Sequence, residues 1–195
     1  MGDFPMSMSK PTLVCIDEVD KAGAAANMIY QRTLDSREFY MPEMKEAGNK
    51  VIIPHPNWVI CATSNTTGDG DDTDLYMTSN VQDKAFLNRF NAMIEVPYAS
   101  YDAELEVAED VADGQLHPDM IASLVNFSQL MHKAYEERNV TTAFSFRQLI
   151  NIIEDVKSGM DMRTAVTFGY FNFCSKSEQS DVAESFRTCF GRDLL

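Results

Sequence analysis

The 195-residue sequence predicts an α/β unit followed by an all-helical domain. Two short, continuous apolar runs, residues 12–16 (TLVCI) and 58–63 (WVICAT), are typical of strands buried on both faces of a parallel sheet. The alanine-rich stretch between them, residues 21–34, favours a helix. A strand, a helix and a second strand in this order indicate an α/β architecture, with function at the carboxyl ends of the strands.

The segment between the helix and the second strand predicts an inserted β-hairpin. In residues 38–56, two β-prone pieces flank a Gly48-Asn49 turn. After the second strand, residues 66–80 are rich in Gly, Asp and Thr, which predicts a long loop. A loop of this length inside a compact domain is usually functional or mobile.

The remainder of the chain predicts a short helix, a third strand and then helices only. We expect the short helix at residues 81–90 and the strand at residues 92–96 (AMIEV), closed by Pro97. The domain boundary is therefore expected between residues 1–98 and 99–195. The predicted helices of the second domain span residues 101–112, 118–138, 145–157, 160–173 and 177–190.

Charge and composition restrict the partners of this chain. The net charge of -14 and the pI near 4.5 work against nucleic-acid binding, which depends on Lys and Arg displacing counterions. No apolar run approaches the roughly 20 residues of a membrane-spanning helix, and the amino terminus lacks the pattern of a signal peptide. We therefore expect a cytoplasmic protein without a membrane partner.

The four cysteines predict no metal site. They occur singly, without a CxxC pair or a companion histidine at the spacing of metal ligands. Cys15 and Cys61 fall inside the two apolar runs, so we expect both thiols to be buried as small hydrophobic groups in a reducing compartment. The other two are Cys174 and Cys189.

Asp17 and Glu18 directly follow the first apolar strand. In a phosphate-transfer site, one acid at this position can hold Mg²⁺, usually through water, while its neighbour polarises the attacking water. Asn65 follows the second strand, where an amide can orient water or contact a γ-phosphate. Acidic strand exits and asparagine turns are also common without any catalytic role.

Two arginines complete the candidate residues. Arg89, at the end of the predicted short helix, can project from a subunit edge and neutralise transition-state charge in a neighbour. Arg147 lies in the first turn of a predicted helix, beside its apolar stripe, and can reach a nucleotide phosphate across a domain cleft. The alternatives are an interaction with the helix dipole for Arg89 and a local salt bridge for Arg147.

Together, the order and spacing of these motifs resemble the AAA+ ATPases. TLVCIDEVDKAG resembles a Walker B strand, ICATSN the sensor 1 strand, FLNRF the arginine-finger helix end and FSFRQLIN the sensor 2 helix of the lid domain. The predicted hairpin matches the pre-sensor 1 insertion of the clade that includes MoxR-like ATPases. Within that clade, IPHPNWVICATSNTTGDGDDTDLY and the FRTCFGRDLL tail resemble the CobS-type ATPase subunit of aerobic cobaltochelatase.

The resemblance implies a role for each candidate residue. Asp17 would coordinate Mg²⁺ through ATP and water, and Glu18 would be the catalytic base. Asn65 would be sensor 1 and Arg147 sensor 2, while Arg89 would act in trans on the neighbouring subunit. The implied fold is a partial AAA+ P-loop NTPase core with a helical lid, assembled into a homo-oligomeric ring, a hexamer.

One part of the family pattern is missing. The sequence contains no G-x-x-x-x-G-K-[ST] loop, the Walker A motif whose backbone amides and lysine hold the phosphates. The chain is then either a fragment of a longer protein or a naturally shortened relative. Both interpretations predict weak ATP binding and no hydrolysis by this chain in isolation.

Three functional hypotheses remain open at this stage. The first is an ATPase module that remodels a partner protein, as in cobaltochelatase-like insertion of a metal into a tetrapyrrole or in MoxR-like maturation of a client. The second is a non-catalytic module that joins a ring without hydrolysing ATP. The third, a DNA-remodelling member of the same clade, is disfavoured by the acidic charge.

Overall fold

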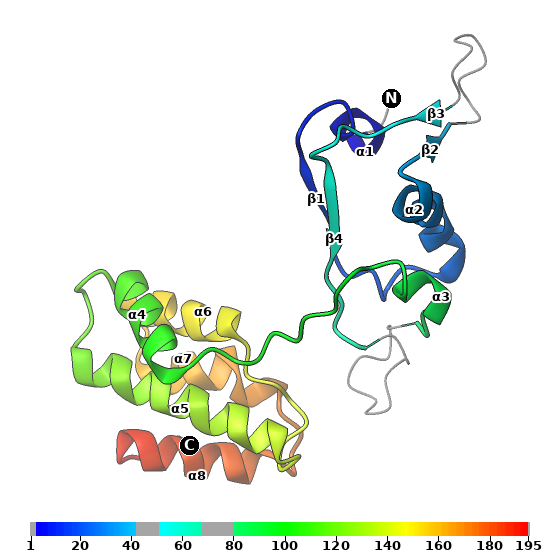
Figure 1. Cartoon of the computed structure of the whole chain (residues 1–195). Helices are drawn as coiled ribbons and strands as arrows, with labels where there is room; N and C mark the ends of the chain where they lie inside the picture. Colours follow the sequence, from blue (N-terminus) through cyan, green and yellow to red (C-terminus); the bar gives the residue numbers. More distant parts are fainter. Residues whose placement is uncertain (1–2, 42–50, 68–79, 195) are drawn as a thin grey trace. The chain divides into compact units, whose positions relative to one another are not determined.

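The computed structural model describes residues 3–41, 51–67 and 80–194. The chain divides into two compact units, Met1–Glu95 and Val96–Leu195. The first unit contains strands and helices, and the second contains only helices (Figure 1). The predicted fold class is confirmed: an α/β unit with a parallel strand pair is followed by a helical unit, as expected of a partial P-loop core with a helical domain.

The first unit contains two small sheets. Strands β1 and β4 pair in parallel, and β2 and β3 pair antiparallel. The arms of the predicted hairpin are therefore present, whereas the Gly48-Asn49 turn and most of the predicted polar loop lie outside the described residues. The elements are α1 (Asp3–Ser7), β1 (Leu13–Ile16), α2 (Ala24–Ser36), β2 (Phe39–Tyr40), β3 (Val51–Ile52), β4 (Val59–Ala62) and α3 (Lys84–Leu87).

The β1–β4 sheet is less covered than the sequence predicts. Leu13 lies opposite Val59, and their side chains are 68% and 54% exposed. Cys15 is exposed and Cys61 half-buried, so the prediction that both are buried was wrong. The physical reason is that a pair of strands buries little by itself, and apolar runs are hidden only where further strands and helices cover them.

The predicted third strand, residues 92–96, is also wrong. This segment carries no strand in the structure, and its side chains Met93, Ile94 and Val96 are exposed. A β-prone sequence becomes a strand only when a neighbouring strand accepts its backbone hydrogen bonds. Among the described residues, this segment has none.

Aromatic packing holds α1 in the first unit. The ring of Phe4 meets the rings of Tyr30, Phe39 and Trp58 edge to face, at centroid distances of 5.2, 5.3 and 5.8 Å. The indole nitrogen of Trp58 also donates a hydrogen bond of 3.0 Å to the Ser7 hydroxyl. These contacts link α1 to α2, to β2 and to the residue that precedes β4.

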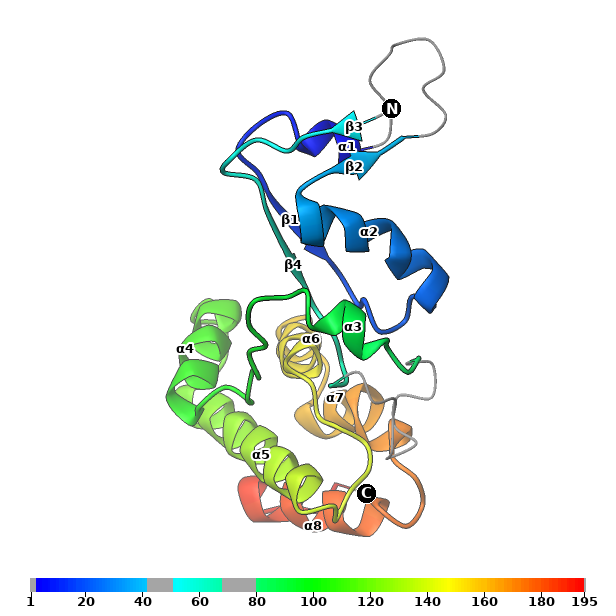
Figure 2. The same ribbon diagram turned by 45° about the vertical axis from the view of Figure 1, so that its right-hand side comes forward.

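The second unit consists of five α-helices and one short 3₁₀ helix, close to the predicted segments (Figure 2). Side chains that accept a backbone N–H begin four of the α-helices, which satisfies donors that have no partner inside the helix. The elements are α4 (Tyr101–Ala112), α5 (Pro118–Glu136), α6 (Phe146–Lys157), α7 (Met162–Gly169), the 3₁₀ helix Phe171–Phe173 and α8 (Gln179–Phe190). The capping residues are Ser100, His117, Ser145 and Asp161.

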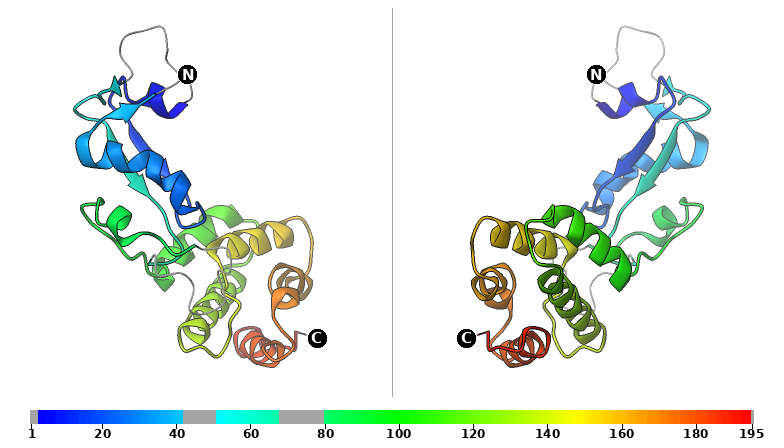
Figure 3. Two further views of the ribbon diagram at one scale, coloured as in Figure 1. Left: turned by 90° about the vertical axis from the view of Figure 1, so that its right-hand side faces the viewer. Right: turned by 90° about the vertical axis from the view of Figure 1, so that its left-hand side faces the viewer.

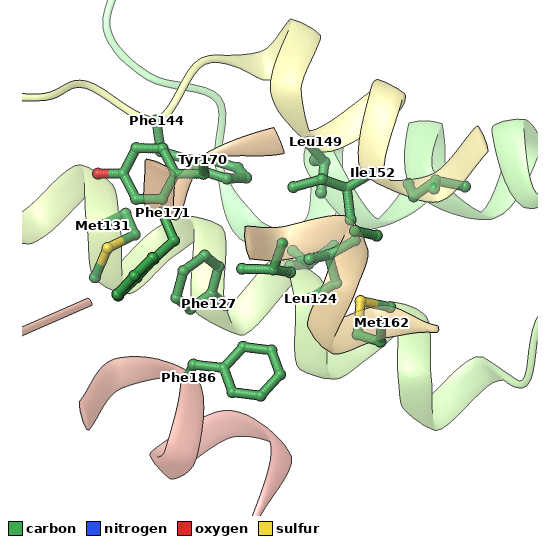
Figure 4. Close-up of a cluster of buried hydrophobic side chains, with 14 of the residues drawn as sticks. Leu124, Phe127, Met131, Phe144, Leu149, Ile152, Met162, Tyr170, Phe171 and Phe186 are labelled. Carbon is green, nitrogen blue, oxygen red and sulfur yellow. The ribbon is translucent and has the colours of Figure 1, made fainter. Parts of the chain in front are cut away.

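An aromatic cluster forms the core of the second unit (Figure 4). Phe127 on α5 packs against Phe144, Tyr170 and Phe186, with ring centroids 5.7, 6.2 and 6.2 Å away. Helix α8 packs against α5, and the two helices are neighbours in both views of Figure 3. Across the described ranges, every helix falls short of the length and apolarity that crossing a bilayer needs.

Candidate functional site

Thr63 connects the carboxyl end of β4 to that of β1 through hydrogen bonds. Its hydroxyl donates a hydrogen bond of 2.6 Å to Asp17 Oδ1 and accepts one of 2.9 Å from the backbone N–H of Glu18. Its own backbone N–H and carbonyl continue the ladder to Ile16 and Val19, both at 2.9 Å. These bonds hold the Asp17 carboxylate and the Glu18 backbone at one edge of the parallel pair, and both residues are exposed to solvent.

Glu18 has an unusual backbone conformation. Its φ angle is 51°, in the left-handed region that costs a non-glycine residue roughly 1–2 kcal/mol. Strain of this kind is often retained at functional sites. Its side chain forms an ion pair with Lys21 at 2.6 Å, with both side chains nearly half exposed. The carboxylate is therefore accessible to solvent and is paired with Lys21.

A buried carboxylate, Asp20, links this turn to Asn65. Asp20 is fully buried, and its Oδ2 accepts hydrogen bonds from the Asn65 backbone N–H at 3.3 Å and the Thr66 hydroxyl at 3.4 Å. The Asp20 carbonyl accepts from the backbone N–H of Asn80 at 2.8 Å and from the Gln82 amide at 3.1 Å. The structure therefore places Asn65 beside the turn that carries Asp17 and Glu18.

Arg89 lies just beyond α3 and is engaged inside its own unit. Its Nε donates a hydrogen bond of 2.8 Å to Asp35 Oδ2 on α2, and Nη1 donates to the Ala85 carbonyl. The Arg89 side chain is 24% exposed and that of Asp35 is 52% exposed. Since the ion pair is open to solvent, salt screens it and its contribution to stability is small.

Arg147 belongs to the second unit, where it occupies the first turn of α6. Helix α6 begins with a capping box in which Ser145 and Gln148 exchange hydrogen bonds with each other's backbone. The Arg147 side chain is exposed and forms no ion pair with any residue in the described part of the chain. Its position beside the carboxylates of the first unit stays a prediction.

Sequence reasoning missed Thr63 and Asp20. A signal for Thr63 was present, because a hydroxyl residue ends the second apolar run two positions before Asn65. Asp20 offered a weaker signal as the last acid of the DEVD stretch. Nothing in the sequence distinguishes a buried acid there from a solvated one, because its burial depends on Asn80 and Gln82, sixty residues further along the chain.

The residues at this edge fit a magnesium ion that is bound mainly by phosphate and water. Mg²⁺ prefers oxygen ligands and usually takes one or two carboxylates together with substrate phosphates. Asp17 supplies one exposed carboxylate beside the Thr63 hydroxyl. Within the described residues, no cluster of three His, Cys, Asp or Glu side chains forms a metal site of its own.

In the first unit, the structure thus brings a carboxylate pair at the end of one parallel strand close to the polar turn after its neighbour, and the second unit is helical with an exposed arginine at the start of α6. The chain is 25% identical, over 198 aligned positions, to the aerobic cobaltochelatase subunit CobS of Sinorhizobium sp. The alignment covers 99% of this chain and 58% of that protein. The chain matches no protein-family model. The resemblance to CobS-type ATPases is thereby confirmed.

Proposed function

We propose that this chain is part of an AAA+ module that couples ATP hydrolysis to the remodelling of a partner protein. The observation that carries the proposal is the edge where Thr63 binds Asp17 and Glu18 together while Asp20 holds Asn65 beside them. Similarity to CobS along nearly the whole chain supports the same class.

In the proposed reaction, each residue at this edge has one task. Asp17 would hold the Mg²⁺ that accompanies ATP, which supplies charge neutralisation at the phosphates. The Glu18 carboxylate would accept the proton of the attacking water, and Lys21 would have to release it first. Asn65 would orient that water or contact the γ-phosphate without adding charge.

The two arginines extend the site beyond the first unit. Arg147, exposed at the start of α6, would contact the phosphates as a lid residue. Arg89 would reach the nucleotide of a neighbouring copy in a ring, which we propose to be a hexamer, after exchanging Asp35 for phosphate. Arginine fingers are worth roughly 10³ to 10⁵ in rate in the systems that use them.

ATP binding also needs a phosphate-binding loop, which the sequence does not contain. We propose that polypeptide outside this sequence supplies it. The exposed β1–β4 sheet and the unpaired segment 92–96 are apolar surfaces that such polypeptide would cover. Without it, ATP binding by the chain is expected to be weak.

The proposed partner is another protein. By analogy with the CobS relative, the finer hypothesis is a cobaltochelatase-like complex that inserts a metal into a tetrapyrrole. A chaperone that matures another protein is the alternative within the same class. The strongly acidic charge disfavours nucleic acid in either case.

The test is ATP hydrolysis by this chain joined to the phosphate-loop segment of a CobS-type ATPase. Glu18→Gln should lower turnover by about 100-fold or more while a fluorescent ATP analogue still binds, because it removes the base and keeps the shape. Exposed Glu106 on α4 provides the control, and Glu106→Gln should leave turnover unchanged. Unchanged turnover in Glu18→Gln would rule out the assigned base.

The absence of the loop motif from the sequence favours one further candidate, a non-catalytic module that assembles without hydrolysis. The same fusion distinguishes the two. If it binds ATP but hydrolyses none with wild-type Glu18 in place, and the chain still co-assembles with a CobS-type ring, the non-catalytic function is favoured.

A further inference from the structure

A buried amide side chain, that of Gln82, contacts the turn that follows β1. Gln82 is 3% exposed and lies just before α3. Its Nε2 is within hydrogen-bond distance of the backbone carbonyls of Asp20, Ala22 and Asn80, at 3.1, 3.3 and 2.9 Å. The first two carbonyls belong to the turn that also carries Glu18. Gln82 therefore joins this turn to the start of α3.

Asn27 on α2 supports the Gln82 side chain from its other end. Asn27 is 1% exposed, and its Nδ2 donates hydrogen bonds of 2.6 Å to Gln82 Oε1 and of 3.2 Å to the Val19 carbonyl. The oxygen of the Gln82 amide thus faces a donor, whereas its nitrogen faces the three carbonyls. A flipped amide would set acceptors against acceptors. The surroundings of Gln82 therefore determine its orientation.

The turn depends on these contacts because it contains a strained residue. Glu18 has a φ angle of 51°, and a non-glycine residue keeps such a conformation only where its surroundings enforce it. The next two residues, Val19 and Asp20, are buried. Water cannot readily replace the amides that their carbonyls would lose, so the loss carries the cost of desolvation. We therefore expect the turn to shift when the Gln82 amide is removed.

Gln82 also ties the turn to the segment that carries Arg89. Helix α3 packs against α2 (Figure 1). At its start, Asp83 follows Gln82 and accepts a hydrogen bond of 2.8 Å from the Ala85 backbone N–H. Beyond its end, Arg89 pairs with Asp35 on α2 at 2.8 Å. If Arg89 exchanged Asp35 for phosphate, Gln82 would still join the start of α3 to the turn.

We propose that Gln82 is a positioning residue for Glu18: it holds the turn that presents this carboxylate and makes the place of the carboxylate depend on α3. This role rests on the proposed function, in which Glu18 is the base and Arg89 serves a neighbouring copy. It adds regulation within the first unit, because a displacement of α3 by that copy would reach the base through Gln82.

Amide hydrogen exchange of this chain tests whether Gln82 holds the turn, and it needs no ATP. Gln82→Met keeps the length of the side chain and removes its hydrogen bonds. The backbone amides of Val19 and Lys21, which are hydrogen-bonded in the wild type, should exchange about 10-fold faster relative to the amide of Tyr30 inside α2. An unchanged ratio would overturn the proposal.

Thr33→Val is the matched control. It removes a buried hydrogen bond of 3.2 Å from the Thr33 hydroxyl to the Glu38 carbonyl, at the other end of α2. This variant should destabilise the unit without changing the exchange of the turn relative to α2. If Gln82→Met does not fold, Asn27→Ala replaces it. That variant removes the support of the Gln82 amide but keeps its contacts with the turn, so it should change the exchange ratio in the same direction by less.

ATP turnover tests whether the held turn matters for the base. In the fusion with the phosphate-loop segment, Gln82→Met should lower kcat by about 10- to 100-fold, because a base displaced by a fraction of its reach is poorly aligned. Affinity for a fluorescent ATP analogue should be unchanged. Thr33→Val should alter neither quantity. Equal losses of kcat in Gln82→Met and Thr33→Val would indicate general destabilisation and overturn the proposal.

The variants separate this role from the proposed function. If Glu18→Gln stops turnover while Gln82→Met leaves kcat unchanged, the proposed function stands and the role of Gln82 is overturned. If the wild-type fusion hydrolyses no ATP, the proposed function fails. The role of Gln82 for the base then fails with it, even where hydrogen exchange shows that Gln82 holds the turn.

Discussion

Glu178 joins the segment before α6 to the start of α8. Its buried carboxylate accepts hydrogen bonds from the backbone and hydroxyl groups of Thr141 and Thr142 and from the backbone N–H of Ser175. Burial alone would raise the pKa of Glu178, but hydrogen bonds from Ser175 and Thr141 outweigh it and lower the pKa from 4.5 to about 2. The charged form is therefore the one that the folded state stabilises.

This depressed pKa predicts a pH-dependent stability. The contribution of Glu178 should be fully present above pH 4.5, the ordinary value, and should fade as pH falls toward 2. Glu178→Gln should cost about 1–3 kcal/mol of unfolding free energy at pH 7, and the difference from wild type should shrink at pH 3. Urea unfolding of the wild type and of Glu178→Gln at pH 7 and at pH 3 measures this difference in unfolding free energy. Exposed Glu184 on the same helix provides the control, since Glu184→Gln should change stability by less than about 0.5 kcal/mol.

The strained backbone of Glu18 gives a second prediction. Because its φ angle is 51°, Glu18→Gly should be more stable than Glu18→Ala by about 1 kcal/mol, since only glycine adopts this region without a steric penalty. At exposed Glu106 inside α4, the order should reverse by a similar amount. Thermal unfolding of the Gly and Ala variants at Glu18 and at Glu106 measures both differences in stability. Equal stability of the two Glu18 variants would mean that the turn relaxes and stores no strain.

The difference between Asp17 and Asp20 shows what residue-level reasoning can predict. Asp17 was predictable at a strand end because a continuous apolar run stops there. The burial of Asp20 was not, because it follows from hydrogen bonds with Asn65, Asn80 and Gln82 that join distant parts of the chain. The local sequence pattern predicts where the strand ends, whereas tertiary contacts determine which of the acidic side chains after it are exposed to solvent.

At the scale of elements, helices were predicted more accurately than strands. The five α-helices of the second unit were all predicted because periodic apolar residues and capping side chains are local signals. The strand predicted at residues 92–96 failed because a strand also requires a partner. The same reason explains why Leu13 and Val59 are exposed although their runs are typical of buried strands.

Helix α6 allows the contribution of one local signal, its capping box, to the stability of the folded chain to be measured. In its capping box, the Ser145 hydroxyl accepts from the Gln148 backbone N–H at 3.2 Å, and Gln148 Oε1 accepts from the Ser145 backbone N–H at 2.7 Å. Ser145→Ala should cost about 1 kcal/mol of unfolding free energy. Exposed Ser180 within α8 is the control, and Ser180→Ala should be neutral or slightly stabilising because alanine favours helix. A loss at Ser145 no larger than at Ser180 would show that tertiary packing alone sets the start of α6.

At the scale of the whole molecule, the two units differ in how much apolar surface they bury. Among the described residues, the first unit buries Met8, Val19, Trp58 and Phe86, whereas the second buries a continuous cluster of 20 residues. Hydrophobic burial is the main favourable term in folding. The second unit should therefore be the more stable of the two.

This imbalance predicts that the units unfold separately. Calorimetry of the chain should give two transitions, and residues 96–195 expressed alone should retain the upper one. The chosen start keeps Tyr98, whose ring stacks on His132 at 3.9 Å, and Ala99, whose carbonyl accepts from Gln129 at 3.1 Å. A fragment that begins at Tyr101 loses both contacts and should melt several degrees lower. A single transition in the whole chain, together with an unfolded 96–195 fragment, would mean that the helical unit depends on the first unit for its fold.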